Sequence, residues 1–412
     1  MLKKLWRGYR DSSFVLKMTV GFGAGIISGL LFREKMAVFQ PLGTLLINLL
    51  SLVAIPVIFL TVVLAVDQMS IRQLGRIGWK LVLYYAATTA AAVGIGVGLA
   101  LLFQPGKHLT LPNTMVDTPA APNFSDVLFQ LVPSNMFEAF SGGNVMGIIF
   151  LAVIIGLAIS AMKFAEEPEM RRNGELLDRV IVALKEMFSK LLTGVLLYAP
   201  IGVFAISATA FGSQGGATFK SLLAFTAVFY LGITLLWLLV YTSFLRLSGN
   251  SVIDFFKSTK EAYTTAFFTS SSIASLPVAI KAAQKAGVSE KTANFALPLG
   301  AVFNSDGGAL RMGVSIVFAA NITNLELSVS SFFVIVIVGT LLSIGTAGVP
   351  AAGLVTLAAV LTMFGLPLEI VALIAGVDAI IGMGGTASNV TGDLVGAAVV
   401  DKSERKRAVT ES

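Results

Sequence analysis

Three aspartates and one arginine lie inside long apolar stretches of the C-terminal third of the chain: Asp306, Arg311, Asp378 and Asp393. A charged side chain at the centre of a lipid bilayer costs about 3 kcal/mol, so such residues pair with one another or face a polar cavity. Their position therefore predicts a functional site. For Arg311 and Asp378, the alternative is a buried ion pair that only holds two helices together.

These ionisable groups divide by chemistry into an anion site and cation sites. A guanidinium binds a carboxylate through two parallel hydrogen bonds, so Arg311 predicts an anion site. Asp306 and Asp393 have Asn304 and Asn389 close by in the sequence, and all-oxygen surroundings of this kind suit hard monovalent cations. Adjacent cation and anion sites would favour coupled binding of the two ligands.

The composition indicates that membrane helices must position these groups. Of the 412 residues, 56% are hydrophobic and 13% are charged, about half the charged share of a soluble domain. Several apolar stretches reach the roughly 20 residues that a helix needs to cross a bilayer. The chain has no cysteine and a single histidine, and it has no G-x-S-x-G elbow. We therefore expect a polytopic membrane protein that is not an enzyme.

Basic residues gather at the ends of the apolar stretches. The chain begins with MLKKLWRGYR and includes DKSERKR near its C-terminus, and Arg72, Arg76 and Lys80 follow the second apolar stretch. The positive-inside rule places such residues in the cytoplasm, so we expect both termini inside the cell and an even number of crossings. The net charge of +6 comes from basic residues at the ends of the membrane segments, so it does not indicate a nucleic-acid partner.

The pattern of apolar residues divides the chain in two. The first part has six long apolar segments, at 14–32, 39–66, 79–103, 130–162, 177–211 and 216–247, and the charged stretch 163–185 predicts a solvated loop. The second part, 253–401, is interrupted by small polar residues. TSSSIASLP (269–277) and SIGTAGVP (343–350) predict two re-entrant helical hairpins. Each precedes a helix with a polar break, at 304–308 and at 389–393. This internal repeat is typical of secondary transporters, whose sites form at broken helices.

Four motifs in order carry a resemblance that covers nearly the whole chain. TSSSIASLP, PLGAVFNSDGGAL, SIGTAGVP and NVTGD resemble the glutamate-transporter family, the dicarboxylate/amino acid:cation symporters, and the archaeal sodium–aspartate transporters most of all. The resemblance implies eight transmembrane helices, two re-entrant hairpins with inverted repeats, a homotrimer and an elevator mechanism. It also implies three parts: mainly scaffold and trimerisation helices in 1–252, with helices 3 and 6 partly in the transport domain, a transport core in 253–401, and a cytoplasmic tail in 402–412.

Carried over residue by residue, the resemblance implies two to three bound sodium ions. The first sodium site would use Asp393, Asn389 and the carbonyls of Gly300 and Asn304; the second would use the carbonyls of Ser343, Ile344 and Thr346; and the third would use Tyr85, Thr88, Thr89, Asn304 and Asp306. The acid at position 393 favours sodium over protons. The substrate positions are Ser271, Ser272, Arg311, Gly348, Asp378, Gly382, Gly385, Thr386 and Asn389.

The substrate site departs from the amino-acid-transporting members of that family. Where those members read D-M-G-R-T, this chain has Gly382 and Gly385 in place of the acid and the arginine. Ser270 occupies the alternative arginine position, and Arg311 stands where relatives often have tyrosine. We expect Arg311 to fill the vacated space and Asp378 to orient it. Without the amine-binding acid, a small dicarboxylate such as succinate, fumarate or malate becomes the leading substrate.

The sequence thus predicts sodium-coupled symport of a small anionic carboxylate across the cell membrane. Sodium-coupled uptake of aspartate or glutamate is the main alternative, and a neutral amino acid would require Arg311 to be neutralised by Asp378. A channel-like anion conductor is an alternative of a different class, although the sequence has no continuous ring of charges along a pore.

Overall fold

The computed structural model describes residues 14–68, 71–107, 109, 132–142, 144–346 and 352–411, and the secondary structure of this part is helical throughout. The elements of the first part are α2 (Phe14–Phe32), the 3₁₀ segment η1 (Arg33–Phe39), α3 (Gln40–Gln68), α4 (Ile71–Phe103), α6 (Met136–Ser141), α7 (Val145–Lys163), α8 (Pro168–Gln214), α9 (Gly216–Leu235), the π-helical segment η2 (Leu236–Tyr241) and α10 (Thr242–Ser248). Those of the second part are α11 (Val252–Thr269), α12 (Ser272–Lys285), α13 (Glu290–Phe303), α14 (Asp306–Thr323), α15 (Val329–Thr346), α16 (Ala352–Met363), α17 (Glu369–Ala375) and α18 (Asp378–Glu411).

Five of the six apolar segments expected in the first part are helical wherever the structure describes them, and the sixth, 130–162, contains two helices, α6 and α7. The SGGN run separates α6 from α7, and the Asn144 side chain caps α7 by accepting a hydrogen bond from Gly147 N at 3.0 Å. The prediction of a loop over 163–185 was wrong, because α8 begins at Pro168 and runs for 47 residues. Proline is favourable in the first turn of a helix, and Glu169 there complements the helix dipole.

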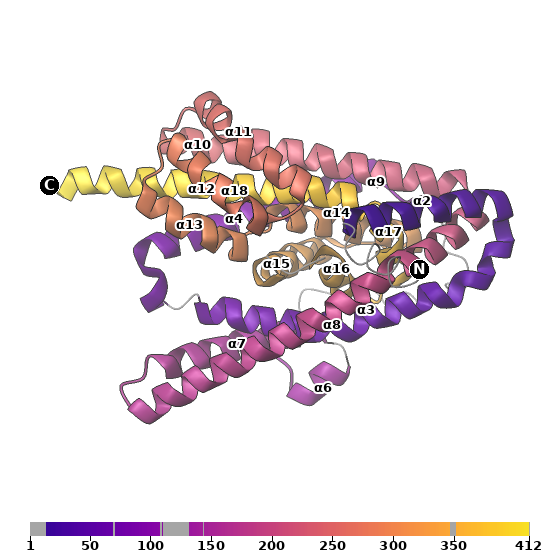
Figure 1. Cartoon of the computed structure of the whole chain (residues 1–412), viewed down its shortest axis with the longest axis horizontal. Helices are drawn as coiled ribbons and strands as arrows, with labels where there is room; N and C mark the ends of the chain where they lie inside the picture. The colour runs from indigo at the N-terminus through magenta and orange to yellow at the C-terminus, as the bar shows by residue number, and fades with distance from the viewer. Residues whose placement is uncertain are drawn as a thin grey trace, which may run out of the picture.

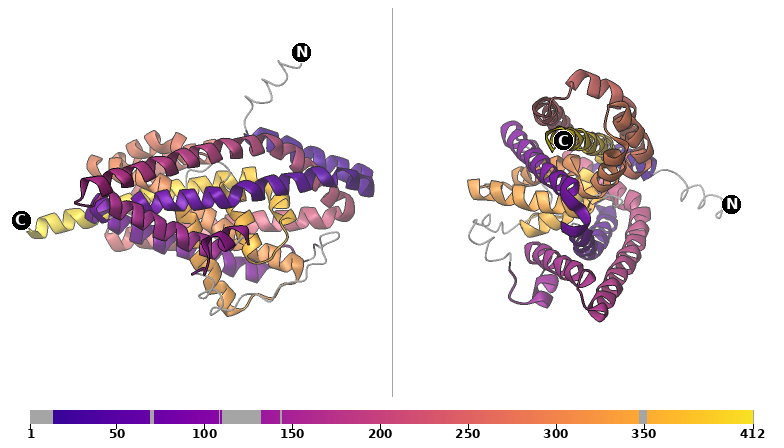
Figure 2. Two further views of the ribbon diagram at one scale, coloured as in Figure 1. Left: turned by 90° about the horizontal axis from the view of Figure 1, so that it is seen from below. Right: turned by 90° about the vertical axis from the view of Figure 1, so that its left-hand side faces the viewer.

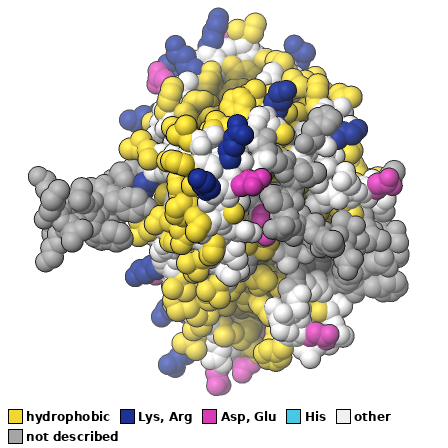
Figure 3. Space-filling view, turned by 90° about the vertical axis from the view of Figure 1, so that its right-hand side faces the viewer, with side chains coloured by type: hydrophobic (Ala, Val, Ile, Leu, Met, Phe, Trp, Pro, Cys, Tyr) yellow, Lys and Arg dark blue, Asp and Glu magenta, His cyan; other side chains and the backbone are white. Residues whose placement is uncertain are grey.

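Long apolar helices account for much of the chain. By length and composition, Leu16–Leu64, Gly75–Phe103, Pro168–Ser213 and Gly216–Ser248 can each cross a membrane among the residues described, and the bent pair Glu369–Ala375 and Asp378–Arg405 adds a fifth candidate. Within the first stretch the chain reverses direction at η1, between α2 and α3 (Figure 1). Figure 3 views one end of the molecule along its long axis, where hydrophobic and basic side chains are both present. Along the helices, large hydrophobic side chains such as Leu31, Leu102 and Leu239 are exposed, as expected of a surface in contact with lipid.

The first predicted hairpin is a pair of helices, α11 and α12, that pack against each other. Its turn is shorter than expected. Ser270 adopts a left-handed conformation (φ 49°), and the Ser271 side chain caps α12 by accepting a hydrogen bond from Ala274 N. Residues 272–277, expected in the turn, are therefore helical.

The second predicted hairpin comprises α15 and α16. Its expected turn began at Ser343, whereas α15 continues to Thr346. Residues 347–351, which include Gly348, lie outside the described residues.

The polar break in the first repeat is confirmed, and its counterpart in the second is displaced. Asn304 and Ser305 separate α13 from α14. Residues 389–393, however, lie within the continuous helix α18, where Thr391 Oγ1 donates to Ala387 O at 2.7 Å. The second break falls instead between α17 and α18, which meet at 77°. There Phe22 packs so closely against Gly376 that a β-carbon would overlap the phenylalanine ring.

Helix α14 lies at the centre of the second part. It packs against α4, α9, α15, α16 and α18, and all of its 18 residues except Gly308, Asn321 and Thr323 are buried. The long helix α8 packs against α2 and α3 on the other side of the molecule. The helices run roughly along one long axis, and α18 extends beyond the others at one end (Figures 1 and 2).

Candidate transport site

The break between α13 and α14 places Asp306 at the first position of α14, where the helix dipole stabilises a carboxylate. The side chain is fully buried. Thr88 and Thr89 of α4 donate hydrogen bonds to Oδ1 at 3.1 and 2.9 Å, and Tyr241 of η2 donates to Oδ2 at 2.7 Å. The predicted association of Asp306 with Thr88 and Thr89 is therefore present as direct contacts.

Asn304, at the end of α13, connects the two predicted cation ligands on α18. Its amide nitrogen donates to Asp393 Oδ1 at 2.9 Å and to the carbonyl of Asn389 at 3.3 Å. The amide oxygen of Asn304 is buried and has no hydrogen-bond partner among the described residues. A buried oxygen with an open lone pair, next to two carboxylates, fits a hard cation such as sodium.

Gly300 allows the approach of Asp393 to α13. A β-carbon at Gly300 would collide with the Asp393 carboxylate and lie 2.7 Å from the Tyr85 hydroxyl. The Gly300 carbonyl accepts the backbone N–H of Asn304 at 2.7 Å. Tyr85 itself donates to the carbonyl of Ala296 at 3.3 Å, so the structure brings Tyr85 beside Gly300 and Asp393, and its hydroxyl bonds to α13.

Asn389 supports the helix break from α18. Its side-chain oxygen accepts a hydrogen bond from Gly307 N at 2.8 Å, and its nitrogen lies 3.4 Å from Ser305 Oγ. The N–H of Gly307 belongs to the first turn of α14, where no intrahelical acceptor exists. Asn389 therefore caps α14 from a neighbouring helix, a contact that the sequence did not predict.

The second predicted sodium site lies at the end of α15. Ser343 Oγ donates to the carbonyl of Ser305 at 2.7 Å, which joins this helix end to the α13–α14 break. Ile344 and Thr346 belong to the last turn of α15. The last carbonyls of a helix have no intrahelical donor, so these groups are chemically suited to a cation.

Arg311 and Asp378 form a buried ion pair between α14 and the first residue of α18, as expected from the sequence. The contact uses only Nη1 of the guanidinium. Nε and Nη2 are buried and have no hydrogen-bond partner among the described residues. Gly353 of α16 covers the guanidinium so closely that a β-carbon would overlap it.

Apart from Gly348, which lies outside the described residues, the remaining predicted substrate residues lie at the start of α12 and on α18. Ser271 and Ser272 stand at the start of α12, where Ser271 acts as the N-cap. Gly382, Gly385 and Thr386 follow Asp378 along α18. Among the described residues, no neighbouring atom lies within 4 Å of the point where a β-carbon of Gly382 would sit, and a β-carbon at Gly385 would make ordinary contacts at 3.8 Å with Gly307 and Phe229. In this part of the structure, both positions can therefore accept a β-carbon.

Sequence reasoning missed three residues of this region: Tyr241, Ser305 and Gly353. Tyr241 lies in the uniformly apolar run LWLLVY, which carries no polar pattern. Ser305 lies within the predicted break at 304–308, but no function was predicted for it. A pairing of Gly353 with Arg311 has no signal in a single sequence.

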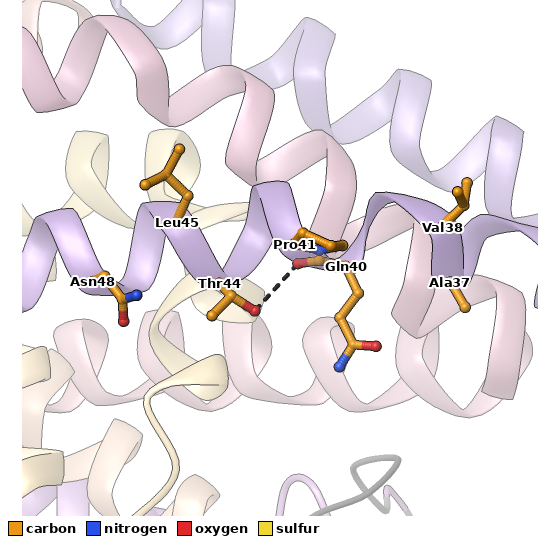
Figure 4. Close-up of a pocket in the computed structure, with 7 residues that line it drawn as sticks. All are labelled: Ala37, Val38, Gln40, Pro41, Thr44, Leu45 and Asn48. Carbon is orange, nitrogen blue, oxygen red and sulfur yellow. Dashed lines mark hydrogen bonds between the residues drawn. The ribbon is translucent and has the colours of Figure 1, made fainter.

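A surface pocket lies elsewhere, where η1 meets α3. It is lined by Ala37, Val38, Gln40, Pro41, Thr44, Leu45 and Asn48, and Figure 4 shows the Thr44 hydroxyl bonded to the Gln40 carbonyl. None of the predicted site residues lines this pocket.

Buried acids and a buried arginine on broken apolar helices define the class of this protein as a membrane transporter. Residues 14–403 match the sodium:dicarboxylate symporter family, and the chain belongs to that family, whose members are symporters and not enzymes. The resemblance seen in the four motifs is confirmed at this level.

Similar proteins span nearly the same length. The chain is 32% identical over 380 residues to the proton/glutamate-aspartate symporter of Escherichia coli K12, covering 89% of this chain and 85% of the relative. It is 29% identical over 406 residues to a C4-dicarboxylate transport protein of Rhizobium etli, covering 96% and 90%. A C4-dicarboxylate transport protein of Anaeromyxobacter sp. strain K is 30% identical over 403 residues, covering 95% and 90%.

Proposed function

We propose that this protein is a sodium-coupled symporter of a small C4 dicarboxylate such as succinate, fumarate or malate. The observation that carries the proposal is the edge of the Arg311 guanidinium formed by Nε and Nη2, which has no hydrogen-bond partner among the residues that the structure describes. These two N–H groups are parallel and match the two oxygens of a carboxylate. Asp378 holds Nη1 and fixes the plane in which a substrate carboxylate would bind.

The absence of an acid at position 382 supports a dicarboxylate over an amino acid. Gly382 offers no carboxylate to a substrate amino group. In this proposal, the hairpin serines Ser271 and Ser272, Gly348, and the α18 residues Gly385, Thr386 and Asn389 surround the rest of the substrate. Two of the relatives above are named as C4-dicarboxylate transport proteins, which favours the same substrate class.

Two to three sodium ions would accompany the substrate. The proposed ligands are Tyr85, Thr88, Thr89, Asn304 and Asp306 at one site, Asn389, Asp393, Gly300 and Asn304 at another, and Ser343, Ile344 and Thr346 at a third. The buried open lone pair of Asn304 and the hydroxyls around Asp306 support the first two sites. A cation there would offset the negative charge of Asp306 and Asp393 and favour anion binding nearby.

The architecture we propose follows the family resemblance. It has eight transmembrane helices, two re-entrant hairpins (α11–α12 and α15–α16), a homotrimer and both termini in the cytoplasm. Residues 253–401 would form a transport core that moves as an elevator against scaffold helices within 1–252, with 402–412 at the cytoplasmic end. The close packing of α14 with α4 and α9 supports a core that includes parts of these two helices.

Uptake of aspartate or glutamate is the second candidate, because the Escherichia coli relative is named as a proton/glutamate-aspartate symporter. That name also makes protons the alternative to sodium. Purified protein in liposomes, given separate inward gradients of sodium and of protons, distinguishes these cases with labelled succinate and labelled aspartate. We expect saturable succinate uptake that requires sodium.

Three results would contradict the proposal. Uptake that follows the proton gradient and ignores sodium would reject the coupling ion. Aspartate transported in preference to succinate would reject the substrate. Non-saturable flux without a sodium requirement would indicate a channel-like conductor.

A further inference from the structure

The π-helical segment η2 directs two side chains of the α9 region toward α18. Trp237 Nε1 donates to Ser388 Oγ at 3.1 Å, and the Tyr241 hydroxyl lies 3.4 Å from the same oxygen. The segment spans Leu236–Tyr241 between two α-helices. Single π-helical turns inside α-helices are rare and frequently lie at functional sites, so the contacts of this turn are of interest.

The hydrogen bonds form a directional chain that ends at Asp306. The Trp237 indole can only donate, so Ser388 Oγ accepts there and can donate its own proton to the Tyr241 oxygen. Tyr241 then donates to Asp306 Oδ2 at 2.7 Å, and the carbonyl of Ser388 is a second acceptor at 3.0 Å. Tyr241, Ser388 and Asp306 are each 0% exposed, so these bonds are shielded from bulk solvent.

The two oxygens of Asp306 have different kinds of partner. Oδ1 accepts from the hydroxyls of Thr88 and Thr89, and Thr88 also has the carbonyl of Tyr85 as an acceptor at 3.2 Å. Thr88 can therefore turn its proton to that carbonyl and present lone pairs to a cation. Oδ2 is held instead by a phenol on a rigid ring, which is itself fixed by Ser388.

We propose that Tyr241 is a positioning residue for the cation site. By holding Oδ2, it keeps Oδ1 turned toward Thr88 and Thr89 as the cation-binding oxygen of Asp306. The inference rests on the proposed function, because it assumes that Asp306 binds a co-transported sodium ion. Residues that orient a metal ligand through a hydrogen bond typically change metal affinity by about 10- to 100-fold when they are replaced.

The test is sodium binding to purified protein by isothermal titration calorimetry, without substrate. Tyr241→Phe removes the hydroxyl and keeps the ring, and we expect its sodium affinity to fall by about tenfold or more. Tyr84→Phe is the matched control, since the Tyr84 hydroxyl is also buried next to this region but has no hydrogen-bond partner among the described residues. We expect wild-type sodium affinity in that variant.

A second measurement uses the wild-type hydrogen-bond chain itself. In a Trp6→Phe/Trp79→Phe background, Trp237 is the only tryptophan, because the chain has three. We expect its fluorescence emission to change on sodium titration with the calorimetric midpoint. If Tyr241→Phe does not fold, this fluorescence measurement still tests whether the hydrogen-bond chain through Tyr241 is linked to sodium binding.

The outcomes separate this inference from the proposed function. Sodium binding in the wild type with unchanged affinity in Tyr241→Phe overturns the role of Tyr241 alone. If the protein binds sodium but the fluorescence emission of Trp237 does not change with sodium concentration, the role of Tyr241 is also overturned. A wild type that binds no sodium overturns both the coupling proposal and this inference.

Discussion

The surroundings of Asp306 and those of Arg311 differ in how far the protein itself satisfies their hydrogen bonds. Asp306 receives bonds from Thr88, Thr89 and Tyr241, so donors from two separate helical elements surround it. Arg311 has a single partner, Asp378, and leaves two buried N–H groups unpaired among the described residues. The described residues therefore already orient the Asp306 carboxylate, whereas they satisfy only part of the hydrogen-bonding capacity of the Arg311 guanidinium.

This difference indicates which site is built around its ligand. A buried donor without a partner costs about 1–3 kcal/mol, and more for a charged group. A structural ion pair between two helices would gain from hydrogen bonds to the rest of the guanidinium, and no described residue makes one here. A substrate carboxylate would satisfy both free N–H groups at once. Four variants can test this comparison.

The largest effect is expected from removing the guanidinium. Removing Arg311 alone would leave Asp378 buried and unpaired at a cost of about 3–5 kcal/mol, so the variant is Arg311→Met with Asp378→Asn. Losing two charge-assisted hydrogen bonds should reduce succinate affinity by about 100-fold or more, while sodium affinity stays within about twofold. Calorimetry measures both. Succinate affinity close to the wild-type value would show that Arg311 is only structural.

Asp306→Asn tests the other side of the comparison. The amide keeps the size of the side chain but loses the charge that would hold a cation, so we expect sodium affinity to fall by at least about tenfold. Succinate affinity in the absence of sodium should change little. The comparison fails if this variant weakens sodium-free succinate binding as strongly as the arginine variant does.

Gly300→Ala should act through packing. The added β-carbon would meet the Asp393 carboxylate and the Tyr85 hydroxyl, and overpacking of this kind costs about 1–3 kcal/mol. We expect a lower melting temperature and weaker sodium binding. Gly98→Ala is the control, because that glycine has no heavy atom within 4 Å of the added carbon. Equal effects in both variants would contradict the packing argument.

The smallest effect is expected at the end of α18, away from both sites. Glu404 contacts Arg76 at 2.5 Å and Lys80 at 2.8 Å, and Arg76 is 49% exposed. Exposed ion pairs contribute about 0–1 kcal/mol and weaken in salt. Glu404→Gln should therefore lower the melting temperature slightly at low salt and hardly at all at high salt. A large fall in melting temperature that does not depend on salt would mean that this contact stabilises the protein as much as the buried pair of Arg311 and Asp378.

Much of the fold was predictable from the spacing of apolar residues. The segments 14–32 and 216–247 correspond closely to α2 and to α9–α10. The break at 304–305 was predictable because Asn, Ser, Asp and Gly interrupt an apolar run. The break before Asp378 was not predicted; Phe22 of a distant helix packs against Gly376 there, a contact that a single sequence does not reveal.

The candidate site was predictable in its residue types and less so in its contacts. The pairing of Arg311 with Asp378 followed from the cost of isolated charges in a membrane. The bond from Tyr241 to Asp306 joins residues 65 positions apart, and no local pattern marks it. The sequence predicts that Asn389 binds cation and substrate, and it gives no sign of the capping contact that the Asn389 side-chain oxygen makes with α14. Helix breaks create N–H groups that only tertiary contacts can satisfy.

The continuity of α18 has a mechanical consequence. One helix runs from Asp378, which holds Arg311, to Glu404, which contacts α4 at the other end. At 1.5 Å per residue these positions are about 39 Å apart. The helix therefore joins the two ends directly, and we expect a displacement of its Asp378 end to be transmitted toward Glu404. The chain has no cysteine, so one cysteine introduced near Glu404 could carry a single spectroscopic label. Such a label would detect movement of the helix that holds Arg311 from a position far from that residue.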